Sequence, residues 1–184
     1  MTADQYACTR AVLDAEPEAA VVANLGVASW VLAETDDRDR NYYMRGAMGC
    51  TTPVGLGLAL SIDDPVVVLD GDGSLLMSLG CLSTVGTCAP SNLTIVVWVN
   101  RSFATTGGQP TAGVDFAAAA EACGVAGTAV ERLDEFRASL DEAADRDGPS
   151  LIACSVETVD TEGPDTYDYA HEYREHRFRT ALEP

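Results

Sequence analysis

The stretch Pro65 to Ser74, PVVVLDGDGS, decides how this chain folds. Its first six residues, Pro65 to Asp70, begin with proline, continue with three valines and a leucine, and are followed by glycine, which is the pattern of a buried strand. The next four, Gly71-Asp72-Gly73-Ser74, carry two glycines that let the backbone turn sharply and approach a ligand closely. We therefore predict a strand that ends in a tight turn and opens directly into a helix.

Strand and helix patterns alternate on both sides of this stretch. Further strands are predicted over Ala19–Ala23, Leu93–Val99, Ala126–Val130 and Ser150–Val156. Helices are predicted after the Gly26 turn and over Thr51–Ser61, Ser74–Thr87, Phe116–Cys123 and Leu133–Asp145. Continuous apolar strands are usually covered on both faces, so this alternation predicts an α/β fold with a doubly wound, mainly parallel sheet and helices on both faces. We expect one domain over residues 1–160, followed by a C-terminal tail helix within 161–184.

Charge and composition exclude some functions. The formal net charge is -18, and a phosphate backbone needs a basic face, so nucleic acid is not an expected partner. No apolar run reaches the ~18 residues of a membrane span, and the N-terminus lacks a signal-peptide pattern, so we expect a soluble, cytoplasmic protein. All 11 basic residues are arginine. This acidic, lysine-free composition suggests a halophilic protein whose self-repulsion is screened by salt, or alternatively an arginine-rich product of a G+C-rich genome.

Cysteines and histidines give no metal-binding pattern. The six cysteines form no C-x-x-C pair and have no histidine at ligand spacing, so we interpret them as small apolar side chains rather than zinc or iron–sulfur ligands. Both histidines, His171 and His176, lie in the tail with several arginines and tyrosines. The tail is either a terminal helix docked on the domain or on a neighbour, or a lid or anion-binding element near an active site.

Asp72 indicates a bound cation. Free N–H groups at a helix start suit a phosphate, and a carboxylate there repels that phosphate unless a cation lies between them. Mg²⁺, which prefers oxygen ligands together with phosphates, fits this role. Asn100 ends the strand Leu93–Val99, 28 positions after Asp72, so a parallel sheet brings both residues to one edge. Each residue taken singly has a simpler interpretation, Asp72 as a helix cap and Asn100 as a turn residue.

Several segments together resemble thiamine-diphosphate (TPP) enzymes. The G-D-G-S loop followed by a strand-end asparagine resembles their cofactor motif. Asn100 to Thr111, NRSFATTGGQPT, is similar to the corresponding loop of sulfopyruvate and phosphonopyruvate decarboxylases. The resemblance extends over YMRGAMGC from Tyr43, GLGLAL from Gly55 and HRFRTAL from His176. It implies that residues 1–160 form a TPP diphosphate-binding domain, with TPP and Mg²⁺ as cofactors.

The resemblance also implies roles for individual residues. Mg²⁺ would be bound by the side chains of Asp72 and Asn100 and by the backbone carbonyl of Ser102. Within the loop that begins at Gly71, Gly73 and Ser74 would donate hydrogen bonds to the diphosphate.

The other end of the cofactor would meet the segment from Arg45 to Met48. The carbonyl of Gly46 would accept a hydrogen bond from the aminopyrimidine, and Met48 would hold the cofactor bent, or would simply be a core methionine. Ala47 stands where the family has serine, and Arg45 stands where a neutral residue is usual.

Gly26 and Thr105 would contact the cofactor from neighbouring loops. Thr106 and Arg45 are candidates for the substrate side of the site. Arg45 is otherwise a surface or interface arginine.

The resemblance also indicates what this chain lacks. In this family a glutamate on a separate pyrimidine-binding domain activates the cofactor, and 184 residues leave room only for the diphosphate half. We therefore expect no catalytic residue here, and a separate pyrimidine-binding α subunit in an α2β2 or larger assembly. The expected function is decarboxylation of a small anionic 2-oxo acid, sulfopyruvate to sulfoacetaldehyde and CO2. The alternatives are phosphonopyruvate decarboxylase, another TPP-dependent 2-oxo acid enzyme subunit, and a non-catalytic TPP-binding regulatory subunit.

Overall fold

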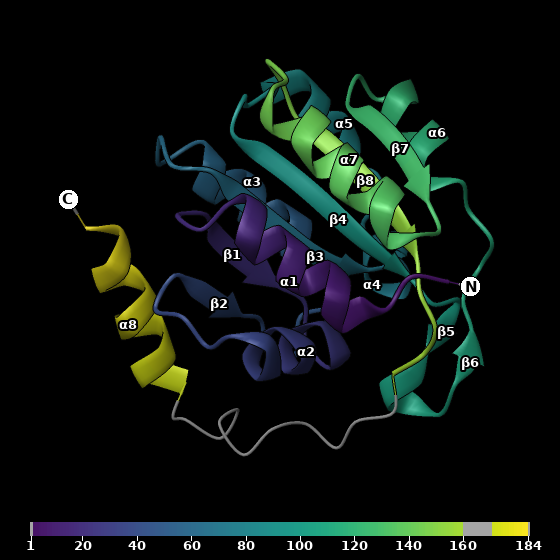
Figure 1. Cartoon of the computed structure of the whole chain (residues 1–184), viewed down its shortest axis with the longest axis horizontal. Helices are drawn as coiled ribbons and strands as arrows, with labels where there is room; N and C mark the ends of the chain where they lie inside the picture. The colour runs from purple at the N-terminus through teal and green to yellow at the C-terminus, as the bar shows by residue number, and fades with distance from the viewer. Residues whose placement is uncertain (1, 160–170, 184) are drawn as a thin grey trace.

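The sheet at the centre of the molecule is parallel throughout. A computed structural model describes residues 2–159 and 171–183 (Figure 1). Its six-stranded sheet has the order β2-β1-β3-β4-β8-β7, and every pair of neighbours is parallel. The strands are β1 (Ala20–Ala23), β2 (Asn41–Tyr43), β3 (Val66–Gly71), β4 (Leu93–Val99), β7 (Ala126–Val130) and β8 (Ser150–Ser155). The predicted α/β fold with a parallel sheet is confirmed.

Helices cover both faces of this sheet, as predicted. One hydrophobic cluster joins the sheet to α1 (Gln5–Ala15), α2 (Val27–Thr35) and α7 (Leu133–Ala144). The other joins it to α3 (Thr51–Ala59), α5 (Cys81–Cys88) and α6 (Phe116–Ala122). Figure 1 shows α1 and α7 in front of the strands and α3 and α5 behind them. Strand β3 divides its side chains between these clusters, with Val67 and Leu69 in the first and Val66 and Val68 in the second, because successive residues of a strand point to opposite faces.

Some elements differ from the prediction. The helix predicted over Ser74–Thr87 is two helices, α4 (Asp72–Leu76) and α5, separated by a turn around Ser78. There the Ser78 hydroxyl donates a 2.5 Å hydrogen bond to the carbonyl of Gly49, a tertiary contact that local sequence does not reveal. Helix α1, strand β2, the small antiparallel pair β5 (Ser102–Phe103) and β6 (Gln109–Pro110), and the 3-10 turn η1 (Ala104–Thr106) were not predicted.

The C-terminal helix α8 (His171–Leu182) packs beside the edge strand β2. Phe178 of α8 is buried, and its ring centroid lies 5.2 Å from that of Tyr42. Figure 1 shows α8 at the opposite side of the molecule from β5 and β6. The predicted domain boundary at residue 160 lies outside the described residues, and within the described part no helix is long and apolar enough to cross a bilayer.

Candidate functional site

A pocket opens at the carboxyl ends of β1, β3 and β4. Parallel strands place all their carboxyl ends at one edge, and the register pairs Asp70 with Val97 and Gly71 with Trp98. The residues after β3 therefore face those after β4. The pocket is lined by Gln5, Asn24, Leu25, Val27, Ala28, Met48, Gly71, Asp72, Gly73, Ser74, Trp98, Asn100, Ser102, Phe103, Ala104, Thr105 and Thr106.

Asp72 connects the two strand ends. Its carboxylate is almost fully buried. Oδ2 accepts hydrogen bonds from the backbone N–H of Arg101 and from the hydroxyl of Thr111, both at 2.8 Å. Oδ1 accepts from the backbone N–H of Gly73 at 2.7 Å. The side chain is therefore fixed between the helix start and the loop that follows β4.

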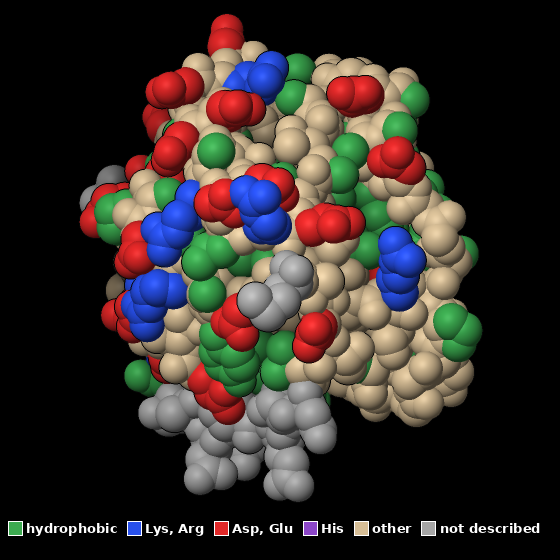
Figure 2. Space-filling view, turned by 45° about the vertical axis from the view of Figure 1, so that its right-hand side comes forward, with side chains coloured by type: hydrophobic (Ala, Val, Ile, Leu, Met, Phe, Trp, Pro, Cys, Tyr) green, Lys and Arg blue, Asp and Glu red, His purple; other side chains and the backbone are tan. Residues whose placement is uncertain are grey.

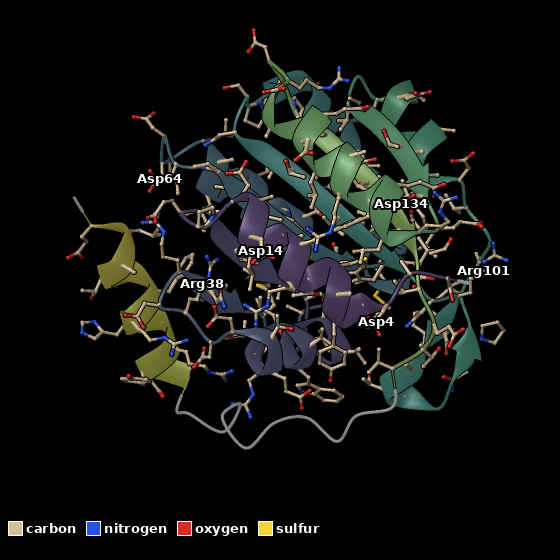
Figure 3. The ribbon with its side chains drawn as sticks, viewed as in Figure 1. Asp4, Asp14, Arg38, Asp64, Arg101 and Asp134 are labelled. Atoms are coloured by element: carbon tan, nitrogen blue, oxygen red, sulfur yellow. The ribbon has the colours of Figure 1, made fainter. Side chains whose placement is uncertain are left out.

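Asn100 follows β4 and lies opposite Asp72, where the loops after β3 and β4 meet. We call this place the Asp72–Asn100 junction. The Oδ1 of Asn100 accepts a 2.9 Å hydrogen bond from the backbone N–H of Ser102, which holds the loop in a tight turn. Between them, Arg101 has a φ of +57°, an uncommon value for a residue with a side chain, and it is this turn that directs its N–H to Asp72. Figure 3 shows the Arg101 side chain at the outer edge of the molecule, beside β5 and β6.

The turn after β3 is closely packed. A Cβ atom on Gly73 would lie 2.4 Å from Cε1 of Phe103, so only glycine fits there without a shift. The Ser74 hydroxyl is buried and accepts a 3.1 Å hydrogen bond from the N–H of Gly49, which draws the loop that carries Met48 to the pocket. Behind the turn, burial raises the pKa of Asp70, although hydrogen bonds from Ser74 and Thr52 oppose the shift.

Gly26 and Asn24 follow strand β1 at the third side of the pocket. Gly26 has a φ of +75°, and a Cβ atom there would lie 3.0 Å from Cγ2 of Thr105, so the predicted residues Gly26 and Thr105 are neighbours. Asn24 was not predicted. Its Oδ1 accepts from the Thr51 hydroxyl at 3.1 Å, and it lines the pocket. The rule that selected Asn100, a polar residue at a strand end, applies equally to Asn24.

Most of the predicted site residues line this pocket, but Gly26, Arg45 and Gly46 do not. Gly26 lies between two lining residues, Leu25 and Val27. Met48, Asp72, Asn100 and Thr106 are among the lining residues. Arg45 and Gly46 are exposed on the loop between β2 and α3 and are not among them. Gly46 has a φ of +67° and no atom within 4 Å of a built Cβ, so the space beside its Cα is open in this chain.

The oxygen atoms at the junction suit a hard cation. Asp72 supplies a carboxylate, Asn100 an amide oxygen and Ser102 a backbone carbonyl, all of the type that Mg²⁺ prefers. Among the described residues no three His, Cys, Asp or Glu side chains lie close enough to form a metal site of their own. Asp72 is the one acidic side chain among the lining residues, so a phosphate there would need such a cation to offset the charge.

Comparison with known proteins agrees with this geometry. The model of the family "Thiamine pyrophosphate enzyme, C-terminal TPP binding domain" matches residues 25–154. The chain is 44% identical over 160 residues to phosphonopyruvate decarboxylase of Streptomyces viridochromogenes, covering 85% of this chain and 40% of that protein. It is 30% identical to sulfopyruvate decarboxylase subunit beta of Methanococcus maripaludis, covering 99% of each.

A solved structure has the same fold. The benzoylformate decarboxylase of Polynucleobacter necessarius superposes with a TM-score of 0.73 at 25% identity, over 83% of this chain and 33% of that one. The chain thus spans about a third of that structure and about 40% of the phosphonopyruvate decarboxylase. The matched residues 25–154 contain β3, β4 and the whole Asp72–Asn100 junction. The chain therefore belongs to the thiamine pyrophosphate enzymes and contains their C-terminal TPP-binding domain.

Proposed function

We propose that this chain is the TPP- and Mg²⁺-binding subunit of a two-subunit 2-oxo acid decarboxylase, and that it acts on sulfopyruvate to give sulfoacetaldehyde and CO2. The observation that carries the proposal is the mutual 99% coverage with a protein named as a sulfopyruvate decarboxylase subunit beta. That relative is itself named as one subunit of its enzyme, which supports a partner subunit for this chain.

Different pocket residues would hold different parts of the cofactor. Asp72, Asn100 and the carbonyl of Ser102 would bind Mg²⁺, and Gly73 and Ser74 would donate to the diphosphate. When bound, TPP would supply the nucleophilic carbon and the electron sink for decarboxylation. Met48, which lines the pocket, would support the cofactor ring, and Gly26 and Thr105 would close the other side.

The substrate side would be completed outside this pocket. Among its described lining residues there is no glutamate, so the group that activates the cofactor would come from a pyrimidine-binding subunit in an α2β2 or larger assembly. Arg45 and Gly46 are exposed, and such a subunit could enclose them. Arg45 and Thr106 would then face the anionic end of the substrate.

Two alternatives stay open. Phosphonopyruvate is also a small anionic 2-oxo acid, and 44% identity to a phosphonopyruvate decarboxylase favours it as the second candidate substrate. The other alternative is a non-catalytic TPP-binding regulatory subunit, which would use the same oxygens of Asp72, Asn100 and Ser102 to hold the cofactor but would turn over no substrate.

The proposal is tested by affinity purification of the chain in multimolar KCl with Mg²⁺ and TPP, followed by mass identification of co-purifying chains. The reconstituted pair is then assayed for CO2 release from sulfopyruvate and from phosphonopyruvate. Turnover of sulfopyruvate supports the proposal, turnover of phosphonopyruvate alone selects the second substrate, and an inactive assembly that binds TPP supports a regulatory subunit.

Asp72→Asn is the informative variant. Asparagine keeps one oxygen acceptor for the loop but loses the charge that balances Mg²⁺, so we expect at least about a 10-fold loss of Mg²⁺-dependent TPP affinity, with turnover lost in parallel. Asp115→Asn is the matched control. Asp115 is exposed and caps α6 by accepting from the N–H of Ala118 at 3.0 Å, a bond that asparagine can also make. An Asp72→Asn enzyme with wild-type activity would refute the metal role.

A further inference from the structure

Two segments of this chain contain no charged residue. The sequence contains 29 acidic and 11 basic residues, yet none falls within residues 46–62 or within residues 73–100. These two segments contain α3, α5 and all of α4 after its first residue, Asp72, and α3 adjoins both of the other helices. Figure 2 shows many acidic side chains on the face of the molecule that it draws.

The outward residues of α3 and α5 follow helical spacing. We call this surface the uncharged face. From α3 and its two ends it contains Cys50, Pro53, Val54, Gly57, Leu60 and Ser61, and from the α4–α5 turn and α5 it contains Met77, Gly80, Ser83, Thr84, Thr87 and Cys88, all exposed.

Large apolar side chains stand out on this face. Met77 is 61% exposed, Leu60 57% and Val54 38%. In the described part of the chain, only Tyr173 joins them as an exposed large hydrophobic residue. On a protein with a net charge of -18, a surface that combines apolar exposure with an absence of charge has the composition of an interface core, where charged residues are depleted and methionine is enriched.

The uncharged face is continuous with the pocket. A built Cβ on Gly49 would lie 3.1 Å from Cβ of Met77, and Gly49 follows Met48, which lines the pocket. Two hydrogen bonds fix this contact, one from the Gly49 N–H to Ser74 at 3.1 Å and one from Ser78 to the Gly49 carbonyl at 2.5 Å. A protein that covers Met77 therefore reaches the rim of the pocket.

We infer that the uncharged face is the docking surface for the pyrimidine-binding subunit, with the exposed Met77 and Val54 as apolar contacts. The inference rests on the proposed function, which requires a second protein to bring a glutamate to the pocket rim. Contact at the Met77 end of the face meets that requirement, and the partner surface is expected to be apolar and uncharged in turn. A second copy of this chain could also bury the face, and the experiment separates these occupants.

The test introduces a charge at Met77. Met77→Asp leaves a mostly exposed side chain in the free chain, so the fold is expected to hold, but in a complex the carboxylate would be buried without a partner. We expect the dissociation constant for the co-purified, identified partner chain to rise at least about 30-fold, the size of a hot-spot loss. That desolvation cost persists in multimolar KCl, where long-range repulsion is screened.

Ala138→Asp is the matched control. Ala138 is exposed on α7, on the opposite face of the sheet, so it adds the same charge away from the proposed interface. We expect its dissociation constant to stay within about twofold of the wild-type value. Equal weakening by both variants, or wild-type affinity of Met77→Asp, would overturn the inference.

Thiol labelling gives a second measurement on the unmodified surface. Cys50 is exposed on the uncharged face next to the pocket rim, so its alkylation by iodoacetamide should slow strongly when the partner binds. A cysteine introduced as Ala138→Cys should react at the same rate with and without partner. Cys50 protection in the isolated chain that grows with its own concentration would instead show that a second copy occupies the face.

These outcomes separate the inference from the proposed function. If the wild-type pair assembles and decarboxylates a 2-oxo acid while Met77→Asp assembles normally, the function stands and the docking surface is wrong. If the pair assembles through Met77 but turns over no 2-oxo acid, the docking surface stands and the function is wrong.

Discussion

Gly73 is the residue at which the pocket tolerates least change. Its missing side chain leaves room for the Phe103 ring, with Cε1 and Cδ1 at 2.4 and 2.8 Å from a built Cβ. Gly73→Ala must push this ring and the loop that carries it away from the turn. We expect a loss of about 1–3 kcal/mol in the free energy of unfolding, as in other overpacked sites, together with weaker TPP binding. Denaturant unfolding and calorimetric titration with TPP and Mg²⁺ measure the two effects.

Gly57→Ala is the control for this prediction. Gly57 lies within α3 with no atom within 4 Å of a built Cβ, so alanine adds no clash and favours the helix by up to about 1 kcal/mol. If Gly73→Ala were as stable as Gly57→Ala, the Phe103 contact would not constrain the turn.

Among individual residues, the sequence predicts the site residues that follow strands better than the site residues that lie in loops distant along the chain. Asp72 and Asn100 could be predicted because parallel strands share an edge, and the same argument reaches Asn24. Thr111 contacts Asp72 across 39 positions, and nothing local indicates that contact. The roles assigned to Arg45 and Gly46 came from resemblance, and their exposure leaves those roles to be tested with the partner present.

At the scale of elements, Arg177 attaches α8 to the edge of the sheet. Its guanidinium donates to both carboxylate oxygens of Asp37, at 3.0 and 2.7 Å, and to the carbonyl of Arg38 at 3.3 Å. The Arg177 side chain is only 11% exposed. Arg177→Gln is expected to lower the free energy of unfolding by about 1–3 kcal/mol, because it removes hydrogen bonds between charged groups. It should also speed hydrogen exchange within α8.

Arg179→Gln provides the matched change on the same helix. Arg179 is exposed, so this variant should stay within about 0.5 kcal/mol of the wild type. Equal effects of the two substitutions would mean that α8 is held by its apolar contacts, such as Phe178 against Tyr42, and not by the Asp37 pair.

The same pair gives a dependence on pH. Burial of the Asp37 carboxyl acts to raise its pKa, but hydrogen bonds from Arg177 and Tyr43 outweigh that effect, and the pKa is lowered. A pKa below the unfolded value of about 3.9 means that the pair stabilises the fold above that pH, and that this stability is lost as the pH falls through the folded pKa. Asp37→Asn should therefore be less stable than the wild type at pH 7, and the difference should shrink towards pH 3. A constant difference would exclude the ion pair as its cause.

Long elements with strong patterns could be predicted, and short ones held by tertiary contacts could not. Strands β3 and β4 are runs of β-branched residues buried on both faces. Strand β2 has only three residues, and it is defined by its parallel pairing with β1 rather than by a sequence pattern of its own. Helix α1 does carry a local signal, because Asp4 caps it by accepting from the N–H of Ala7 at 2.7 Å, and a search for caps could have found it.

At the scale of the whole molecule, net charge sets the conditions in which the fold is stable. Acidic residues exceed basic ones by a margin that gives a formal charge of -18. Among the described residues, the ion pairs join arginine side chains to only a few of the carboxylates. The remaining carboxylates repel one another over distances that salt shortens, from a screening length of ~10 Å at 0.1 M to ~3 Å at 1 M. We therefore propose a protein adapted to high salt.

We expect the melting temperature, measured by calorimetry or circular dichroism, to rise between 0.1 and 1 M KCl. If screening alone is responsible, the rise should flatten above about 1 M, where the screening length is already shorter than the spacing of surface charges. A continued rise towards 3 M would add preferential exclusion of salt from the surface, which strengthens apolar burial. Replacing Asp141, Asp145 and Asp147 of the exposed acidic segment by asparagine should reduce the low-salt part of the rise and leave any high-salt part unchanged. A wild-type melting temperature that is the same at 0.1 and 3 M KCl would show that the acidic composition reflects the arginine-rich genome alternative, and that the fold needs no salt.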